Sequence, residues 1–389
     1  MTSTPPSTLT QYVLWGGLVI GLIFGATGQA TRFCVRGAIA DWVIFRGPAR
    51  LVAWMLAVAI GAACTQLLIV GGTLDATRTL AWAPRLPWAS YLFGGALFGF
   101  GMVLCGGCPQ RNLVKAGAGN LRSVLTLLVV AVAALMTLRG ILAGVRVSMF
   151  DAWVIQLSGP QDLGSLLAPA LHLSPPAARG LLTVLVSAAV LAFAWRVRRS
   201  LDAATVLGGS LVGILVGGAL FLTGHVGFVA EHPETLEPAW LGTQSRRPEA
   251  LSFSAPLGHL LDLLTMWSDK STLLSFGVVV ALGVLAGSHA SARWRGDFRW
   301  EMFSSPREFG AHVAGALLMG FGGVTALGCS IGNGVSGLAL LSLGSVLAVL
   351  GLTAGTCAAL WLQARRAARH DGAAVPQGMA PAASGQALN

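Results

Sequence analysis

The chain has 389 residues, of which 54% are hydrophobic and only 10% charged, and its mean hydropathy is +0.73. Soluble domains are roughly a quarter charged, so this composition excludes an ordinary soluble protein. It predicts an all-α polytopic membrane protein embedded in the lipid bilayer. The net charge of +10 would indicate nucleic acid binding in a soluble chain. Here most arginines lie in short connections, where they set orientation in a membrane, so no nucleic acid partner is expected.

A helix that crosses the hydrocarbon core of a bilayer needs about 20 mostly apolar residues. Nine stretches of the chain meet or approach that length, so we expect about nine transmembrane helices. They span residues 12–30, 51–74, 88–105, 122–145, 177–195, 203–228, 272–291, 309–327 and 340–362. The segment 1–11 before them is expected to be an N-terminal tail. Its first ten residues carry no Lys or Arg, so the positive region of a signal peptide is missing.

Positive residues gather after the first, third, fifth, seventh and ninth of these stretches, which puts them on one side of the membrane. The groups are Arg32, Arg36, Arg46 and Arg50; Arg111, Lys115 and Arg122; Arg196, Arg198 and Arg199; Arg293, Arg295, Arg299 and Arg307; and Arg365, Arg366 and Arg369. Basic residues are enriched in cytoplasmic connections, so the N-terminal tail is predicted to be periplasmic and the C-terminus cytoplasmic. Residues 365–389 are expected to form a disordered tail.

Two apolar segments repeat each other at a constant offset of 221 residues. They are Gly94–Val114 and Gly315–Val335, and ten of their 21 aligned positions are identical. The predicted orientation threads the two copies through the membrane in opposite directions, which is typical of transporters built from inverted repeats. We therefore expect residues 12–145 to form a first repeat of four spans and residues 201–364 a second, inverted repeat. An outer loop and a linking span over residues 146–200 would join them.

Each repeated segment contains a cysteine followed by signals for a short helix. The first reads Cys105-Gly106-Gly107-Cys108-Pro109, and proline suits the first turn of a helix. The second reads Gly328-Cys329-Ser330, where Ser330 is expected to cap the equivalent helix. Both predict half-helices that re-enter the membrane, near residues 106–118 and 329–338. Inverted orientation would bring the two cysteine turns together near the middle of the bilayer.

These turns have the chemistry of a site for a sulfur-containing anion. A helix N-terminus presents unpaired N–H groups and a partial positive charge to an anion. A thiol beside it adds a soft sulfur and a weak S–H donor. We therefore predict that Cys108 and Cys329 line the substrate path as neutral thiols. Cys34, between Arg32 and Arg36 after the first span, is the third candidate for the path.

Four further residues near the turns are candidates for a supporting role. Asn112 and Asn333 follow their cysteines by one helical turn, and we expect them chiefly to hydrogen-bond the backbone of the turn, with contact to substrate as the alternative. Cys105 either belongs to the path or only neighbours it. Ser330 is included through its predicted capping role.

Charged and titratable candidates lie close to the same segments. Arg111 and Lys115 either attract the anion at the inner mouth or fix the topology, and Arg32 and Arg36 are open to the same two interpretations. His225 lies near the position that corresponds to Cys34 in the second half, because the glycines of the first span recur in the sixth at an offset of 192. It is either part of the path or a hydrogen-bonded interior histidine.

At three motifs the chain resembles the YeeE/YedE family of bacterial inner-membrane sulfur transporters. The motifs are Arg32-Phe33-Cys34, Cys105-Gly106-Gly107-Cys108-Pro109 and Leu327-Gly328-Cys329-Ser330-Ile331-Gly332-Asn333-Gly334, and the resemblance runs from about residue 12 to residue 362. It implies an hourglass-shaped helical protein of inverted repeats that takes up thiosulfate through the inner membrane. It also implies that Cys34, Cys108 and Cys329 pass the ion along by S–H···S hydrogen bonds. A cytoplasmic sulfur-carrier protein of the TusA type is a frequent partner in that family.

Other functions stay open at this point. Cys105-x-x-Cys108 is also a spacing of thiol–disulfide oxidoreductases, and some relatives of the family are associated with selenium. A soft-metal transporter would usually show Met, His and acidic side chains along its spans, where few acidic residues occur here. An ATP-driven pump is disfavoured because the chain has no G-x-x-x-x-G-K-[ST] loop. We predict a transporter rather than an enzyme, with no cofactor and no metal site.

Overall fold

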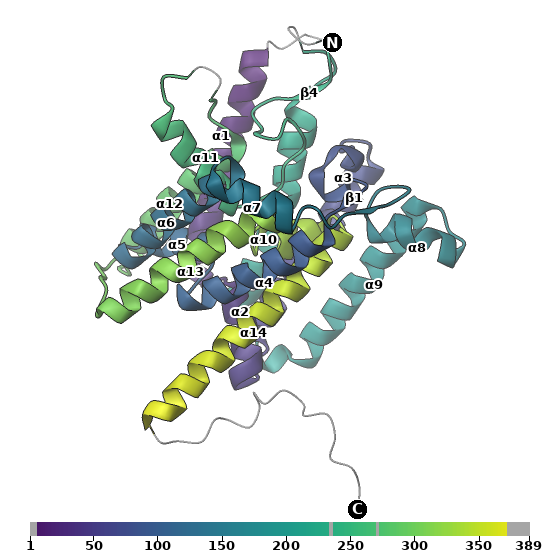
Figure 1. Cartoon of the computed structure of the whole chain (residues 1–389). Helices are drawn as coiled ribbons and strands as arrows, with labels where there is room; N and C mark the ends of the chain where they lie inside the picture. The colour runs from purple at the N-terminus through teal and green to yellow at the C-terminus, as the bar shows by residue number, and fades with distance from the viewer. Residues whose placement is uncertain (1–5, 233–235, 270–271, 372–389) are drawn as a thin grey trace, which may run out of the picture.

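The regular structure of the protein is almost entirely helical (Figure 1). The computed structural model describes residues 6–232, 236–269 and 272–371. Its α-helices are α1 (Pro6–Thr31), α2 (Val35–Ala40), α3 (Ala49–Val70), α4 (Trp88–Leu104), α5 (Pro109–Gly117), α6 (Leu121–Leu138), α7 (Ile141–Met149), α8 (Leu163–Leu171), α9 (Pro175–Arg196), α10 (Ala203–Phe221), α11 (Ser254–Thr265), α12 (Phe276–Trp294), α13 (Pro306–Thr325) and α14 (Leu343–Asp371).

Short turns and strands complete the described part of the chain. The 3₁₀ and π-helical turns are η1 (Asp41–Phe45), η2 (Ala76–Arg78), η3 (Leu80–Trp82), η4 (Arg198–Ser200), η5 (Leu222–Val226) and η6 (Gly332–Gly337). Two antiparallel ladders pair β1 (Arg85–Leu86) with β2 (Ile155–Gln156) and β3 (Phe228–Val229) with β4 (Ala239–Trp240).

Eight helical stretches of the described residues are long and apolar enough to cross a membrane. They are Ser7–Phe45, Ala49–Val70, Trp88–Gly117, Leu121–Leu138, Pro175–Arg196, Ala203–Val226, Phe276–Trp294 and Leu343–Arg366. This confirms an all-α polytopic membrane protein. The remaining expected span corresponds to α13, a helix of 20 residues. Its first two turns carry Arg307, Glu308 and His312, which lower its mean hydropathy.

Three helix boundaries differ from those expected. α1 begins at Pro6, inside the predicted tail, since proline is tolerated in the first turn of a helix. The fourth span ends at Leu138 because Gly140 adopts an extended conformation that separates α6 from α7. α14 continues to Asp371, past the predicted start of the tail at residue 365, because residues 363–369 are mostly Ala and Arg, which favour helix. The rest of the predicted tail, residues 372–389, lies outside the described residues.

The main helices pair through glycines that bring one backbone onto the carbonyl groups of another. A Cβ atom added to Gly25 of α1 would lie 2.2 Å from the carbonyl oxygen of Val284 in α12. One added to Gly99 of α4 would lie 2.1 Å from the carbonyl oxygen of Leu352 in α14. Contacts this close admit no side chain. They are the kind of contact by which helices associate in lipid, where apolar surface alone gives no driving force.

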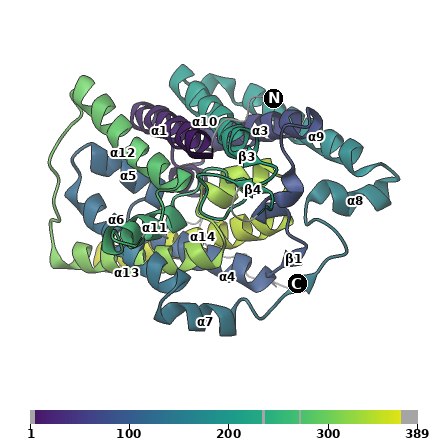
Figure 2. The same ribbon diagram turned by 90° about the horizontal axis from the view of Figure 1, so that it is seen from above.

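Helices of the first half pack chiefly against helices of the second half. The pairs are α1 with α12, α3 with α10, α4 with α14, and α6 with α13, while α9 packs on α3 and α8. Figure 2 shows α8 and α9 at the edge of this arrangement. The short elements of the two halves make corresponding contacts. α5 contacts the helix that follows it, α6, and α12 of the second half, whereas η6 contacts the helix that follows it, α14, and α3 of the first half. This is the pairing that two inverted repeats would give; the repeats themselves stay a prediction.

Replacing Gly99 by alanine is expected to destabilise the protein even though alanine favours helix over glycine by about 1 kcal/mol. The added Cβ would force α4 away from α14, and overpacking of this kind costs about 1–3 kcal/mol. Gly218 of α10 is the matched control because a Cβ there meets nothing within 4 Å. Thermal unfolding of the two variants in detergent should show a lower melting temperature for Gly99→Ala only. A Gly99→Ala variant as stable as Gly218→Ala would contradict the packing described here.

Candidate functional site

The turn before α5 places Cys108 at the N-terminal end of that helix. Cys108 has an extended backbone and caps α5, and Pro109 occupies the first helical position, as predicted. The side-chain amide of Asn112 donates to the carbonyl groups of Gly107 at 2.9 Å and Cys108 at 3.2 Å. Its oxygen accepts from the Ser123 hydroxyl at 3.0 Å. Asn112 therefore holds the turn, the role favoured from the sequence.

The turn after α13 is held in the same way by Asn333. Its amide donates to the carbonyl groups of Gly328 at 3.0 Å and Ala326 at 2.8 Å, and its oxygen accepts from the Ser345 hydroxyl at 3.1 Å. Asn112 and Asn333 thus make corresponding hydrogen bonds to Gly107 and Gly328, which are themselves related by the offset of 221. The two cysteine turns have the same internal support.

The predicted capping role of Ser330 is wrong. The Ser330 hydroxyl is fully buried and has no hydrogen-bond partner of good geometry. The sulfur of Cys329 instead accepts from the backbone N–H of Gly332 at 3.4 Å, three residues further on, where a capping oxygen would act. The residues after Ile331 form the π-helical turn η6 rather than an α-helix. Ile331 therefore occupies the N-cap position of this turn, and Ser330 lies one residue before it.

The sulfur of Cys329 accepts further contacts from the loop between η5 and α12. The backbone N–H of Phe253 lies 3.3 Å from this sulfur, and the Ser252 hydroxyl lies 3.9 Å from it. Phe253 is fully buried and packs against Phe24 of α1, with ring centroids 5.6 Å apart. A segment of the long loop therefore enters the helical bundle and covers Cys329.

Cys34 occupies a related position at the start of α2. It has an extended backbone, and its sulfur accepts from the N–H of Gly37 at 3.4 Å. Arg32, two residues before it, has a left-handed backbone with φ of 54°, which ends α1 and turns the chain toward α2. The cysteine is half-buried and lies at the N-terminus of its own short helix.

The three candidate thiols lie close together in the interior. Cys108 is fully buried, Cys329 is 1% exposed, and both belong to one continuous apolar cluster. Cys34 and Cys329 are both within electrostatic range of the Cys108 thiol, and the Ser330 side chain lies beside it. The S–H of Cys108 has only a long contact of 3.8 Å with Gln110 Oε1. The two cysteine turns therefore lie near each other, and the opposite threading of their segments stays a prediction.

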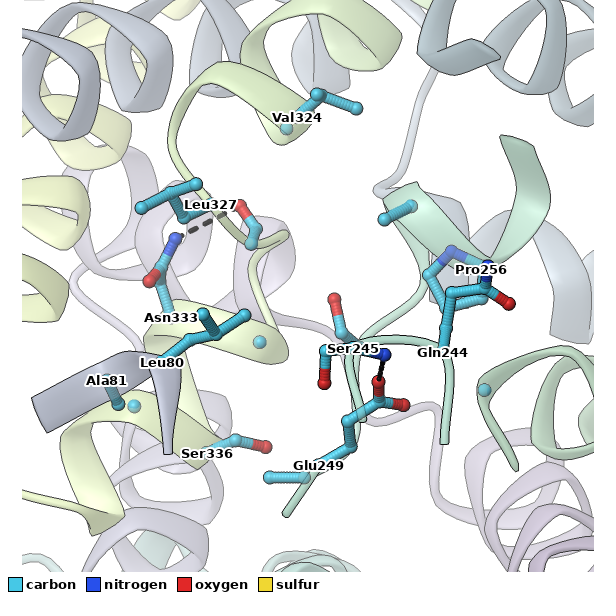
Figure 3. Close-up of a pocket in the computed structure, with 18 of the residues that line it drawn as sticks. Leu80, Ala81, Gln244, Ser245, Glu249, Pro256, Val324, Leu327, Asn333 and Ser336 are labelled. Atoms are coloured by element: carbon cyan, nitrogen blue, oxygen red, sulfur yellow. Dashed lines mark hydrogen bonds between the residues drawn. The ribbon is translucent and has the colours of Figure 1, made fainter. Parts of the chain in front are cut away.

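A cavity of about 450 Å³ adjoins the Cys329 turn, and we call it the loop-side cavity (Figure 3). Its wall includes Gly328, Gly332 and Asn333 from the turn, and Ser252 from the segment that covers Cys329. The rest comes largely from the 244–259 segment, Thr79 and η3, and the ends of α6 and α13. In Figure 3, Leu327 and Asn333 face Ser245 and Glu249 across the space.

A second cavity of about 670 Å³ adjoins the Cys108 turn, and we call it the basic cavity. Cys105, Gly106 and Arg111 belong to its wall. Its charged residues comprise six basic and three acidic side chains. They are Arg32, Arg50, Arg111, Lys115, Arg122, Arg299, Asp297, Glu301 and Glu308. One cavity therefore adjoins the Cys329 turn and the other the Cys108 turn, and the thiols of these turns are buried and line neither cavity.

Four of the six basic side chains of the basic cavity form no ion pair with an acidic side chain among the described residues; they are Arg32, Arg111, Lys115 and Arg299. Arg111 donates to the carbonyl oxygen of Gly28 at 3.0 Å and Lys115 to that of Gly106 at 2.9 Å. In contrast, Arg122 bridges Glu301 at 2.7 Å and Glu308 at 2.6 Å. The wall next to the cysteine turn is therefore positively charged, whereas Glu301 and Glu308 are engaged by Arg122.

The three remaining candidates, Cys105, Arg36 and His225, lie in separate places. Cys105 is fully buried on the wall of the basic cavity, where its S–H donates to the carbonyl oxygen of His312 at 3.1 Å. Arg36 lies on α2, and its Nε is buried without a partner. His225 is exposed at the end of η5, where its ring stacks on Phe221. It lines neither cavity and is not the interior histidine considered from the sequence.

Sequence reasoning missed Ser252 and Phe253, which contact Cys329. A signal for them exists at an offset of 220, where Ser252-Phe253-Ser254 aligns with Arg32-Phe33-Cys34. Both phenylalanines are buried, and each segment is followed at once by a helix, α2 or α11. Ser254 is fully buried, and its hydroxyl has no partner. The offset of 192 instead predicts a residue near His225 as the counterpart of Cys34.

Comparison with known proteins identifies the family of the chain. Residues 30–358 match the model of the family described as Sulphur transport. A protein named thiosulfate transporter TsuA from Escherichia coli strain K12 is 25% identical over 360 residues, which cover 90% of this chain and 94% of that protein. The protein of the same name from Spirochaeta thermophila is 25% identical over 367 residues, covering 91% and 100%. The chain therefore belongs to the sulphur transport family of membrane transporters.

Proposed function

We propose that the protein takes up thiosulfate or a related sulfur-containing anion along a route from the loop-side cavity, past Cys329, Cys108 and Cys34, to the basic cavity. The observation that carries this proposal is that Cys329 and Cys108 are buried in two turns, each of which adjoins one of the two cavities. The substrate class is supported by membership of the family and by the names of the two relatives. A soft sulfur donor at each step suits the terminal sulfur of thiosulfate better than the oxygens of sulfate.

The hydrogen bonds at the thiols support transfer by transient S–H···S contacts. The sulfur atoms of Cys34 and Cys329 each accept a backbone N–H, so their acceptor side is already engaged by the protein. The proton of each thiol is then the group that remains to contact the substrate. The N-terminus of α5 at Cys108 adds unpaired N–H groups and partial positive charge. Together these features favour an anion over a cation on this route.

The proposed orientation of the route in the membrane rests on the distribution of charge. α1 begins at the top of Figure 1, near the loop that carries α11, and α14 ends at the bottom. With the N-terminus in the periplasm of a bacterial inner membrane, the loop-side cavity faces the periplasm and the basic cavity faces the cytoplasm. Arg111 and Lys115 then attract the anion inward after it has passed the thiols. A TusA-like sulfur carrier is the proposed acceptor on that side, an assignment supported only by the family resemblance.

Alanine at Cys34, Cys108 or Cys329 is expected to lower thiosulfate uptake about tenfold or more, since each loses a contact worth about 1.4 kcal/mol. The measurement is growth on thiosulfate as sole sulfur source, in a reporter strain without other sulfur uptake. Cys64→Ala and Cys357→Ala are matched controls, because those half-buried cysteines lie within the helices α3 and α14 and not at the N-terminal end of a short helix or in a cysteine turn. Rescue that survives all three path substitutions would remove the thiols from the mechanism.

The oxidoreductase alternative makes the opposite prediction for serine substitutions. If Cys105 and Cys108 exchanged a disulfide, Cys105→Ser would abolish function and Cys329→Ser would be better tolerated. We expect the reverse, because the Cys105 S–H is engaged by the His312 carbonyl whereas Cys329 adjoins the route. The same growth assay, with protein levels matched in the membrane fraction, decides between the two.

Replacing Lys115 by glutamine is expected to slow uptake severalfold at low ionic strength, because the wall beside the Cys108 turn loses a cation that has no acidic partner. The effect should shrink as salt is added. Arg199→Gln is the control, since that exposed arginine follows α9 outside both cavities. Initial rates in proteoliposomes that are unchanged at low salt would assign Lys115 to topology alone.

A further inference from the structure

The loop-side cavity contains a carboxyl group that the proposed route does not explain. An anion that approaches Cys329 through this cavity passes Glu249, which belongs to its wall. Arg139 and Arg146 also line the cavity, but each is paired with a carboxylate outside it, Asp262 at 2.8 Å and Asp151 at 3.1 Å. Glu249 has no cationic partner among the described residues. The cavity that would admit an anion therefore carries an uncompensated acidic group.

Glu249 is held firmly in this position. Its backbone N–H donates to the Thr223 hydroxyl at 3.1 Å, and that hydroxyl donates to its carbonyl oxygen at 2.7 Å. One carboxyl oxygen, Oε1, accepts from the backbone N–H of Ser245 at 2.7 Å. Figure 3 shows this hydrogen bond on the wall of the cavity, across from Asn333. The second oxygen is left for the cavity, so the side chain presents either a negative charge or an O–H donor to whatever enters.

The surroundings of Glu249 favour the neutral form. Burial raises the pKa of the Glu249 carboxyl, and hydrogen bonds from Ser245 and Gln244 offset this only in part. Arg246 and Arg247, in the same turn, are exposed and form no ion pair with it. His259 from α11 faces the same cavity with an unpartnered Nδ1, and its pKa is lowered by burial and by Arg139. It therefore supplies no positive charge near neutral pH.

We propose that Glu249 is a proton-controlled subsite for the sulfur anion. Protonated, its free oxygen donates a hydrogen bond to an oxygen of the anion in the loop-side cavity. Ionised, the same carboxyl repels the anion and closes the approach to Cys329. This inference rests on the proposed function and adds to it a specificity-determining residue and a dependence on external pH. The proton comes from the medium on the loop side and returns there when the group ionises.

The sign of the pH dependence follows from the chemistry. Uptake is fastest when the external pH is below the pKa of Glu249, and it falls as the pH rises through that value. Glutamine at this position keeps an oxygen to accept from the Ser245 N–H, and it is neutral at every pH. Glu249→Gln should therefore transport at a rate nearly independent of external pH. A merely structural role in the 245–249 turn would leave the pH profile of this variant unchanged.

The test uses the full chain in proteoliposomes, with the internal pH fixed and the external pH varied from about 5 to about 8. Labelled thiosulfate is the probe, and the initial rate is measured. Wild type should slow about threefold to tenfold over this range. Glu249→Gln should stay flat and exceed wild type at the alkaline end, and Glu249→Asp, which still titrates, should keep a slope. Glu231→Gln is the matched control, because this exposed glutamate of the same loop lies outside the cavity.

Two results would overturn the inference. One is a wild-type rate that does not change with external pH. The other is a Glu249→Gln variant that keeps the wild-type slope; if His259→Gln then loses that slope, His259 is the titrating group. Neither affects the proposed route, because Cys108→Ala should lower uptake about tenfold or more at every pH, whereas Glu249→Gln should change its dependence on pH. Loss of uptake in Cys108→Ala together with a flat, active Glu249→Gln supports both proposals.

Discussion

The structure depends on two asparagine side chains that replace missing backbone hydrogen bonds where a helix stops inside the bundle. Backbone polar groups at membrane depth are tolerated only when the protein or a cavity satisfies them. Asn112 and Asn333 each bridge two carbonyl groups of a cysteine turn, and a serine hydroxyl fixes each amide in return. Without this support, the turns that carry Cys108 and Cys329 would leave unpaired carbonyl groups in an apolar interior, at a cost of several kcal/mol. The position of the thiols is therefore a consequence of how the turns are satisfied.

The same turns explain why sulfur, rather than oxygen, is the proposed contact for the substrate. Burying a thiol among apolar side chains costs less solvation free energy than burying a hydroxyl or a charged group would. Backbone N–H groups engage the acceptor side of two of the sulfur atoms, which leaves weak donors along the route. Weak, repeated donors allow an anion to bind at each step without being held there. A route of strong charges would bind the anion more tightly and release it more slowly.

The two cavities differ in the charges that they leave uncompensated. Beside the Cys108 turn, Arg111 and Lys115 use backbone carbonyls as partners and form no ion pair among the described residues. In the loop-side cavity both arginines are paired, and Glu249 is the group without a counter-ion. An inverted-repeat arrangement by itself would make the two sides equivalent. Direction and control of transport would then arise from the residues in which the halves differ, above all those of the 229–271 loop.

The sequence by itself determined the class of the protein, because composition and runs of apolar residues report directly on the solvent that a helix must face. It also identified the cysteine turns and their asparagines, since a repeat at a fixed offset shows residues that share a local structure. Pro109 and Asn112 act as the local pattern predicted, whereas Ser330 does not, because η6 replaces the expected α-helix.

Only the tertiary structure decided which distant segments meet at the site. The backbone N–H of Phe253 contacts the sulfur of Cys329 across 76 residues of sequence, and Glu249 faces a cavity that six or more separate elements enclose. Such contacts follow from the close approach of helix backbones at glycines such as Gly25 and Gly99. Local propensity carries no information about them, because the distance between two segments is set by the packing of every helix between them.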